Sequence, residues 1–144
     1  MLKYNSYGFL EPGVYDLNWE DFKEIFTFNN HRKKLFAGLE LAISELRAVG
    51  CSQVYINGSF ITRKEFPEDF DICWDEENVN LELLTRSYRG LIDFGHKMKT
   101  IKQRYGGDIV PMTSIADEKK GIIFLWFFQE DRQGRQKGII RISL

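Results

Sequence analysis

The chain has 144 residues, 43% of them apolar and 15% aromatic, so its length and composition predict a single domain with one hydrophobic core. Its 20 basic and 21 acidic residues leave a formal net charge of -1, which argues against nucleic-acid binding by bulk charge alone. The two cysteines form no disulfide framework, and neither a secretory leader nor a membrane-length apolar run is present, so we expect a cytoplasmic protein that does not enter a membrane.

The first 30 residues are expected to form an N-terminal loop followed by a short helix. Residues 8–15 carry a Pro-Gly pair, which favours a loop. Asp16 or Asn18 is a suitable N-cap for a helix that continues to Phe26 with its aromatic residues on one face.

A longer helix is predicted from His31 to Val49, because its apolar residues recur mostly every three to four positions. Gly50 is typical of the residue that follows a helix. The period then changes. Residues 53–56 are β-branched and aromatic and lead into Asn57-Gly58-Ser59, which predicts a strand ending in a sharp bend.

The middle of the chain predicts two further strands separated by helix. Residues 69–74 largely alternate polar and apolar side chains, as a strand does. Residues 81–104 are amphipathic and helical in pattern, with an interruption expected at Gly90 or Gly95. Asp108-Ile109-Val110 follows a Gly-Gly pair and predicts a short strand.

The secondary structure predicted for the C-terminal part of the chain is ambiguous in its first segment and a strand in its last. Residues 122–128 are compatible with either a buried helix or a strand, and residues 138–144 predict a final strand. The expected fold is therefore of the α/β (α+β) class, with a mixed sheet of about four to five strands packed against helices. One domain covers residues 1–144, and residues 53–112 contain its central motif.

Two aspartates on the second predicted strand carry the first chemical signal. Side chains alternate across a strand, so Asp69 and Asp71 share one face while Phe70 between them faces the core. Paired carboxylates repel each other unless a cation lies between them. Oxygen ligands of this kind suit Mg²⁺, with Mn²⁺ as the alternative, which binds one or two carboxylates together with substrate phosphates.

The Gly58-Ser59 bend supplies the second signal. A glycine allows a ligand to approach the backbone, and exposed amides with a serine hydroxyl can hold a phosphate. A nine-residue loop, 60–68, joins the bend to the aspartates, and its Arg63 and Lys64 are candidate contacts to a triphosphate. A phosphate-binding bend beside a metal pair is what nucleotidyl transfer needs.

Asp108 is the candidate third carboxylate. It opens a short strand after a helix and a glycine pair, in a position to complete a two-metal site. There it would bind metal and act as a base toward the attacking group.

The segment Ile56-Asn57-Gly58-Ser59, nine residues, then Asp69-Phe70-Asp71-Ile72 resembles the signature of the minimal nucleotidyltransferases of the DNA polymerase beta superfamily. In that family the two acidic residues bind metal and a third acid lies on a later strand. The resemblance implies the same roles for Asp69, Asp71 and, by position, Asp108. It covers residues 53–75 closely and extends loosely to residue 112.

The whole chain also resembles a small group of bacterial and mobile-element proteins with this fold. That likeness rests on residues 8–15, on the central motif, and on two tail segments, 127–132 and 137–142. It implies no particular substrate.

These patterns favour an enzyme that moves a nucleoside monophosphate group from a nucleoside triphosphate to an acceptor. A chain this short has no separate acceptor-binding module, which favours a macromolecular acceptor, protein or RNA. By analogy with nucleotidyltransferase-fold proteins, a place in a toxin-antitoxin or defence system follows, and an oligomer is compatible with the sequence. The alternative is an inactive, antitoxin-like binding protein with the same fold, in which the acidic cluster is vestigial.

Two other segments leave their roles open. The aromatic residues within 124–128 are expected to lie in the core, with a base-stacking wall or a partner-binding patch as the alternatives. Arg132, Arg135 and Lys137 belong either to a solvated loop or to the same cleft as the aspartates. Arg89 and His96 resemble the pair found in HEPN-type RNases, a reading disfavoured by the small amount of helix.

Overall fold

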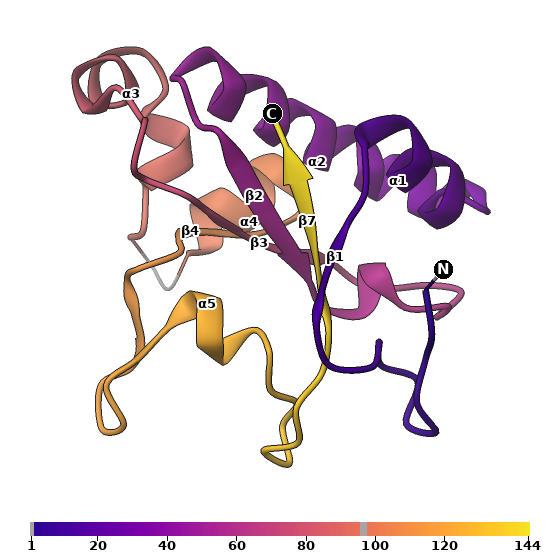
Figure 1. Cartoon of the computed structure of the whole chain (residues 1–144). Coiled ribbons are helices and arrows are strands. Elements are labelled where there is room, and N and C mark those ends of the chain that lie inside the picture. Colours follow the sequence, from indigo (N-terminus) through magenta and orange to yellow (C-terminus); the bar gives the residue numbers. More distant parts are fainter. Residues whose placement is uncertain (1, 96–97) are drawn as a thin grey trace.

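The computed structural model describes residues 2–95 and 98–144, and it has mixed α and β content built around one five-stranded sheet (Figure 1). The helical segments are α1 (Trp19–Phe26), α2 (Asn30–Ala48), η1 (Ser59–Ile61), α3 (Leu81–Ser87), η2 (Arg89–Ile92), α4 (Lys99–Tyr105) and α5 (Phe124–Phe127). The strands are β1 (Val14–Asp16), β2 (Gln53–Asn57), β3 (Phe70–Trp74), β4 (Gly107–Pro111), β5 (Ile115–Asp117), β6 (Ile122–Ile123) and β7 (Ile139–Ser143).

The large sheet has the strand order β1-β7-β2-β3-β4 and is mixed, as expected from the sequence. The pairs at its two edges, β1 with β7 and β3 with β4, are parallel. The central strand β2 runs antiparallel to both of its neighbours, β7 and β3. A separate two-stranded sheet consists of β5 and β6. No helix in the described part of the chain is long and apolar enough to cross a membrane.

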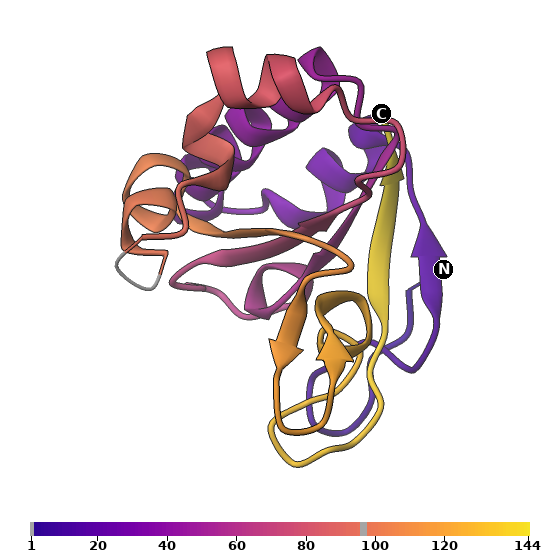
Figure 2. The same cartoon turned by 90° about the vertical axis from the view of Figure 1, so that its left-hand side faces the viewer.

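The two faces of the large sheet are covered differently. On one face, α1, α2 and α4 bury the main core, which includes Ile56 of β2, Ile72 of β3 and Ile109 of β4. On the other face a smaller cluster contains Tyr55 and Cys73 together with residues of the α5 region. Figures 1 and 2 show the long helices gathered on one side of the sheet and α5 on the other. The second face is only partly covered, which leaves room for a cleft.

The structure confirms most of the predicted elements and changes three. Residues 14–16 of the expected N-terminal loop form β1, because they gain backbone partners from β7 at the far end of the chain. The helix expected over residues 81–104, with an interruption at Gly90 or Gly95, is divided into α3, η2 and α4; Gly90 lies within η2 and Gly95 lies between η2 and α4, and His96 lies outside the described residues. Residues 122–128 are neither one helix nor one strand, since β6 ends where α5 begins.

Candidate active site

The bend after β2 lies directly against the second aspartate of the motif. Gly58 has φ +89° and ψ −171°, a positive-φ conformation that is essentially confined to glycine. A Cβ atom at this position would lie 2.6 Å from Asp71 Oδ2, so a side chain cannot be accommodated without a shift. Glycine is therefore needed here both for its backbone conformation and for its close approach to the carboxylate.

The three predicted carboxylates come together on the partly covered face of the sheet. Asp71 of β3 is paired in parallel register with Asp108 of β4, and Asp69 directly precedes β3. Phe70 between the two motif aspartates is fully buried in the main core, as the alternation of side chains requires. Gly107 permits this pairing, because a Cβ there would lie 2.1 Å from the Phe70 carbonyl oxygen.

Lys102 of α4 supplies a cation to this cluster. Its Nζ lies 3.2 Å from Asp69 Oδ2 and 3.7 Å from Asp108 Oδ1. Burial disfavours the charged lysine, but the hydrogen bond to Asp69 and the charges of the neighbouring carboxylates outweigh it and raise the lysine pKa. The ammonium group thus partly neutralises two of the three carboxylates, and it leaves Asp71 without a direct ion pair among the described residues.

Asp71 is the most strongly perturbed carboxyl group of the cluster. Burial, followed by the charges of Asp69 and Asp108, raises its pKa to about 7, although Lys137 and Lys102 oppose the shift. Burial also raises the pKa of Asp108. A carboxyl group that resists ionisation beside two others is the electrostatic situation that a bound divalent cation relieves.

The donor set fits a hard cation such as Mg²⁺. Every candidate ligand is an oxygen, and Asn57, the cross-strand neighbour of Asp71, adds a buried side-chain oxygen with no hydrogen-bond partner among the residues described. Residues 2–95 and 98–144 contain no group of three His, Cys, Asp or Glu side chains already arranged to hold a metal ion. Because the Lys102 ammonium lies between Asp69 and Asp108, a metal bound by these two carboxylates would have to replace that ion pair.

All seven sequence-predicted site residues line one cleft of about 1500 Å³. They are Gly58, Ser59, Arg63, Lys64, Asp69, Asp71 and Asp108. Arg63 is partly engaged elsewhere, since its guanidinium donates to the Ile25 carbonyl oxygen at 3.0 Å and stacks on the Phe28 ring at 4.2 Å. The structure thus places both cationic loop residues at the cleft, and their contact with a triphosphate remains a prediction.

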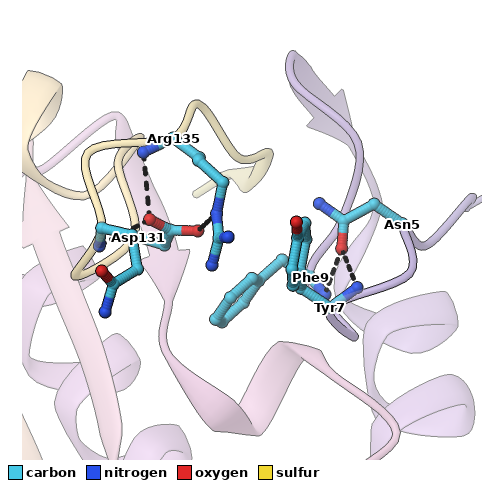
Figure 3. Close-up of polar contacts among 6 residues, drawn as sticks. Asn5, Tyr7, Phe9, Asp131 and Arg135 are labelled. Atoms are coloured by element: carbon cyan, nitrogen blue, oxygen red, sulfur yellow. Dashed lines mark hydrogen bonds and ion pairs between the residues drawn. The ribbon is translucent and has the colours of Figure 1, made fainter.

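The tail cations line the same cleft, which decides between the two placements left open by the sequence. At its rim, the Arg135 guanidinium lies 3.6 Å from the centre of the Tyr7 ring, while Asp131 accepts the Arg135 Nε–H at 2.7 Å (Figure 3). Asn5 fixes the opposite turn by accepting from the amides of Tyr7 and Phe9. The N-terminal turn and the tail loop therefore meet across the cleft entrance.

The aromatic segment divides between core and surface. Phe128 is buried in the smaller cluster, as expected, but Trp126 is 60% exposed and Phe127 is 46% exposed. Because α5 is a single short turn, it can bury only part of its surface against the sheet. The expectation that the whole run lies in the core is thus wrong for these two residues.

Sequence reasoning missed Lys102, which lines the cleft, and Arg32, which is buried behind the loop that follows β2 and donates to its carbonyl oxygens. Lys102 has no motif around it, because its role depends on the packing of α4 beside β4. Arg32 left a weak signal: it precedes Phe36 and Leu39 in the apolar stripe of α2, where a charged residue is out of place unless it is buried with partners.

The match to known families covers nearly the whole chain. Residues 2–143 match a family of unknown function (DUF6932), and the chain belongs to that family. No curated protein and no solved structure matches the chain. A functional conclusion must therefore be drawn from the geometry and chemistry of the cleft.

The raised pKa of Asp71 predicts that metal affinity depends on pH near neutrality. A proton competes with the metal until Asp71 ionises, so Mn²⁺ affinity should rise about tenfold from pH 6 to pH 8 and level off above that range. Calorimetric titration of the full chain with Mn²⁺ at several pH values measures this. An affinity that is constant between pH 6 and pH 8 would contradict the assignment of Asp71 as a metal ligand.

Proposed function

We propose that this protein is a divalent-metal-dependent nucleotidyltransferase that moves a nucleoside monophosphate group from a nucleoside triphosphate to an acceptor. The observation that supports this proposal is that Asp69, Asp71 and Asp108 line one large cleft, with Asp71 and Asp108 paired on adjacent strands and Asp71 close against the glycine of the glycine–serine bend. Carboxylates that hold metal beside a phosphate-binding turn are the minimum that such chemistry requires.

The proposed roles follow from position. Asp69, Asp71 and Asp108 would hold Mg²⁺ or Mn²⁺, which neutralises charge on the triphosphate and polarises its phosphorus–oxygen bonds. Gly58 and Ser59 bind the terminal phosphates through backbone amides and the serine hydroxyl. Asp108, with a side chain 35% exposed to the cleft, accepts the proton of the acceptor hydroxyl.

The reaction is a substitution at the α-phosphorus. The acceptor oxygen forms a bond to that atom, the bond from the α-phosphorus to the bridging oxygen breaks, and pyrophosphate leaves with its electron pair. Positioning and charge neutralisation supply most of the catalysis. The cleft is larger than many small-molecule sites, which supports a macromolecular acceptor, either protein or RNA, as in a toxin-antitoxin or defence-type system.

The first test separates nucleotide binding from transfer. Calorimetry with the Mg²⁺ complexes of ATP, GTP, CTP and UTP should show metal-dependent binding of at least one of them. The double variant Asp69→Asn, Asp71→Asn should then lose transfer of label from the α-labelled nucleotide to protein or RNA in a cell extract. Asp93→Asn, an exposed residue outside the cleft lining, is the matched control. Unchanged labelling by the double variant would eliminate the catalytic assignment.

One observation supports the second candidate, an inactive binding protein of the same fold. Trp126 and Phe127 present exposed aromatic surface on α5, next to the cleft, as an interface for a partner protein would. In that case no Mg²⁺–nucleotide complex binds, and both aspartates can be replaced without effect on partner binding.

A further inference from the structure

Arg32 is a buried arginine with an unusual set of partners. It lies in the first turn of α2 and is 0% exposed, yet no carboxylate in the described part of the chain forms an ion pair with it. Burial lowers its pKa to about 10, which still leaves it protonated at neutral pH. A buried charge is costly unless hydrogen bonds compensate it, so its partners indicate its purpose.

Those partners are carbonyl oxygens, and four of the five belong to the loop that follows β2. Nη1 donates to the oxygens of Phe26 at 3.1 Å and Phe60 at 2.7 Å. Nη2 donates to the oxygens of Ser59, Thr62 and Lys64 at 3.3, 2.9 and 2.6 Å, and Nε donates to Lys64 at 2.9 Å. A single side chain therefore holds most of the loop from Gly58 to Lys64.

Neighbouring side chains hold further carbonyls of the same stretch. Tyr4 Oη donates to the Ile61 oxygen at 3.1 Å, and Asn29 Nδ2 donates to the Glu65 oxygen at 2.6 Å. The carbonyls of this stretch are thus held by side chains of α2, of the residue that precedes it and of the N-terminal segment.

The geometry of the peptide group determines where the backbone amides of this loop point. In a trans peptide the N–H points opposite to the C=O of the preceding residue. When the carbonyls of Ser59 and Thr62 point toward Arg32, the amides of Phe60 and Arg63 point away from it. Neither the Ser59 nor the Arg63 amide donates to an oxygen of the described residues. Because Ser59 and Arg63 line the cleft, these donors are available to an anion bound there.

We propose that Arg32 is a positioning residue for nucleotide binding: it holds the Gly58–Lys64 loop so that its backbone amides face the triphosphate. The inference rests on the proposed function. The positive charge of Arg32, which no described carboxylate balances, lies behind the loop and favours an anion on its other side. Lysine cannot replace it, because lysine offers three donors from one point whereas arginine offers five in a plane.

The test is Arg32→Lys, with Arg47→Lys on the same helix as the matched control, since Arg47 is exposed and distant from the loop contacts. Three quantities are measured well below the melting temperature: affinity for Mg²⁺–nucleotide complexes, affinity for Mn²⁺ alone, and hydrogen exchange of the loop amides. We expect Arg32→Lys to weaken nucleotide binding about tenfold or more and to speed exchange in residues 58–65. Mn²⁺ binding should stay within about twofold of the wild-type value, because the aspartates keep their positions.

Each possible result supports or contradicts the proposed role of Arg32. If the wild type binds nucleotide and Arg32→Lys binds it equally well, the proposed role of Arg32 is wrong while the proposed function stands. If the wild type binds no nucleotide, the proposed function fails, and loop exchange alone decides whether Arg32 orders the loop. Should Arg32→Lys not fold, the Nε–Hε signal of wild-type Arg32 replaces it: the added Mg²⁺–nucleotide must slow its solvent exchange, and no change would refute the inference.

Discussion

Replacing Asp71 with asparagine should raise the melting temperature of the metal-free protein at pH 8, although the same change removes nucleotidyl transfer. In the wild type, ionised Asp71 is buried beside Asp69 and Asp108, which is why its pKa is raised to about 7. A carboxyl pKa raised from 3.8 to about 7 corresponds to an upper bound of about 4 kcal/mol of destabilisation when the group is charged. Asparagine removes that charge and offers an N–H₂ donor on the face where the Asn57 oxygen has no described partner.

The sign of the pH dependence follows from linkage. The folded-state pKa is higher than the unfolded-state value, so the folded chain binds an extra proton between about pH 4 and pH 7. The free energy of unfolding of the wild type therefore decreases as the pH rises through that interval. The advantage of Asp71→Asn should therefore be absent near pH 4 and complete above pH 7. At about 2–4 kcal/mol, the expected gain in melting temperature is about 5–10 °C.

Added metal should reverse the order of stability. With the proposed metal site, Mn²⁺ should bind the folded wild type and raise its melting temperature, whereas the variant would lack a ligand and should respond little. Thermal unfolding with EDTA and with Mn²⁺, at pH 4, 6 and 8, measures all of these effects, with Asp93→Asn as the control. A variant that melts below the wild type at pH 8 in EDTA would show that Asp71 is a structural residue.

This comparison separates a functional site from an ordinary strand position. Selection for stability alone has no reason to retain a carboxylate that weakens the fold at neutral pH. Lys102 partly neutralises Asp69 and Asp108, yet the cluster still keeps Asp71 difficult to ionise. The arrangement is explained if the positive charge that balances Asp71 is supplied by a metal ion that binds together with the substrate.

The central motif was predictable because its geometry is local. A strand period of two fixes Asp69 and Asp71 on one face and Phe70 on the other, whatever the remainder of the chain does. The bend at Gly58 is encoded equally locally, since a strand that ends in glycine and serine turns sharply. The pairing of Asp108 with Asp71 was not predicted: the sequence indicated only a short strand that opens with Asp108, and the parallel register of β3 and β4 is a finding of the structure.

Features that depend on distant partners were not predictable. β1 is three residues long and follows a Pro-Gly pair, so its local pattern indicates a loop, and only its pairing with β7 makes it a strand. Arg32 interacts with carbonyls 27–32 residues away in the chain, and carbonyls leave no trace in a sequence. A charged residue within the apolar stripe of α2 was the available clue, and it indicates a buried partner without identifying it.

Gly58→Ala is the second substitution with a large expected effect, and it tests the contact on which the site depends. The new Cβ would lie 2.6 Å from Asp71 Oδ2, and the backbone conformation, with φ +89° and ψ −171°, adds strain of about 1–3 kcal/mol for any residue with a side chain. Either the bend or the carboxylate must move. Transfer should therefore fall at least about a hundredfold, because catalysis relies on their exact mutual position, and Mn²⁺ affinity should fall with it.

Gly121→Ala separates strain from collision. Gly121 also has a positive φ, +66°, but a Cβ there meets nothing within 4 Å, and the residue is not part of the cleft lining. It should cost stability through strain alone and leave transfer and Mn²⁺ binding near the wild-type level. A double-mutant cycle completes the test: in an Asp71→Ala background the collision partner is gone, so Gly58→Ala should cost less stability there than in the wild-type background. Equal stability costs for Gly58→Ala with and without the Asp71 carboxylate would mean that bend and carboxylate do not touch, and the proposed active site would lose its central contact.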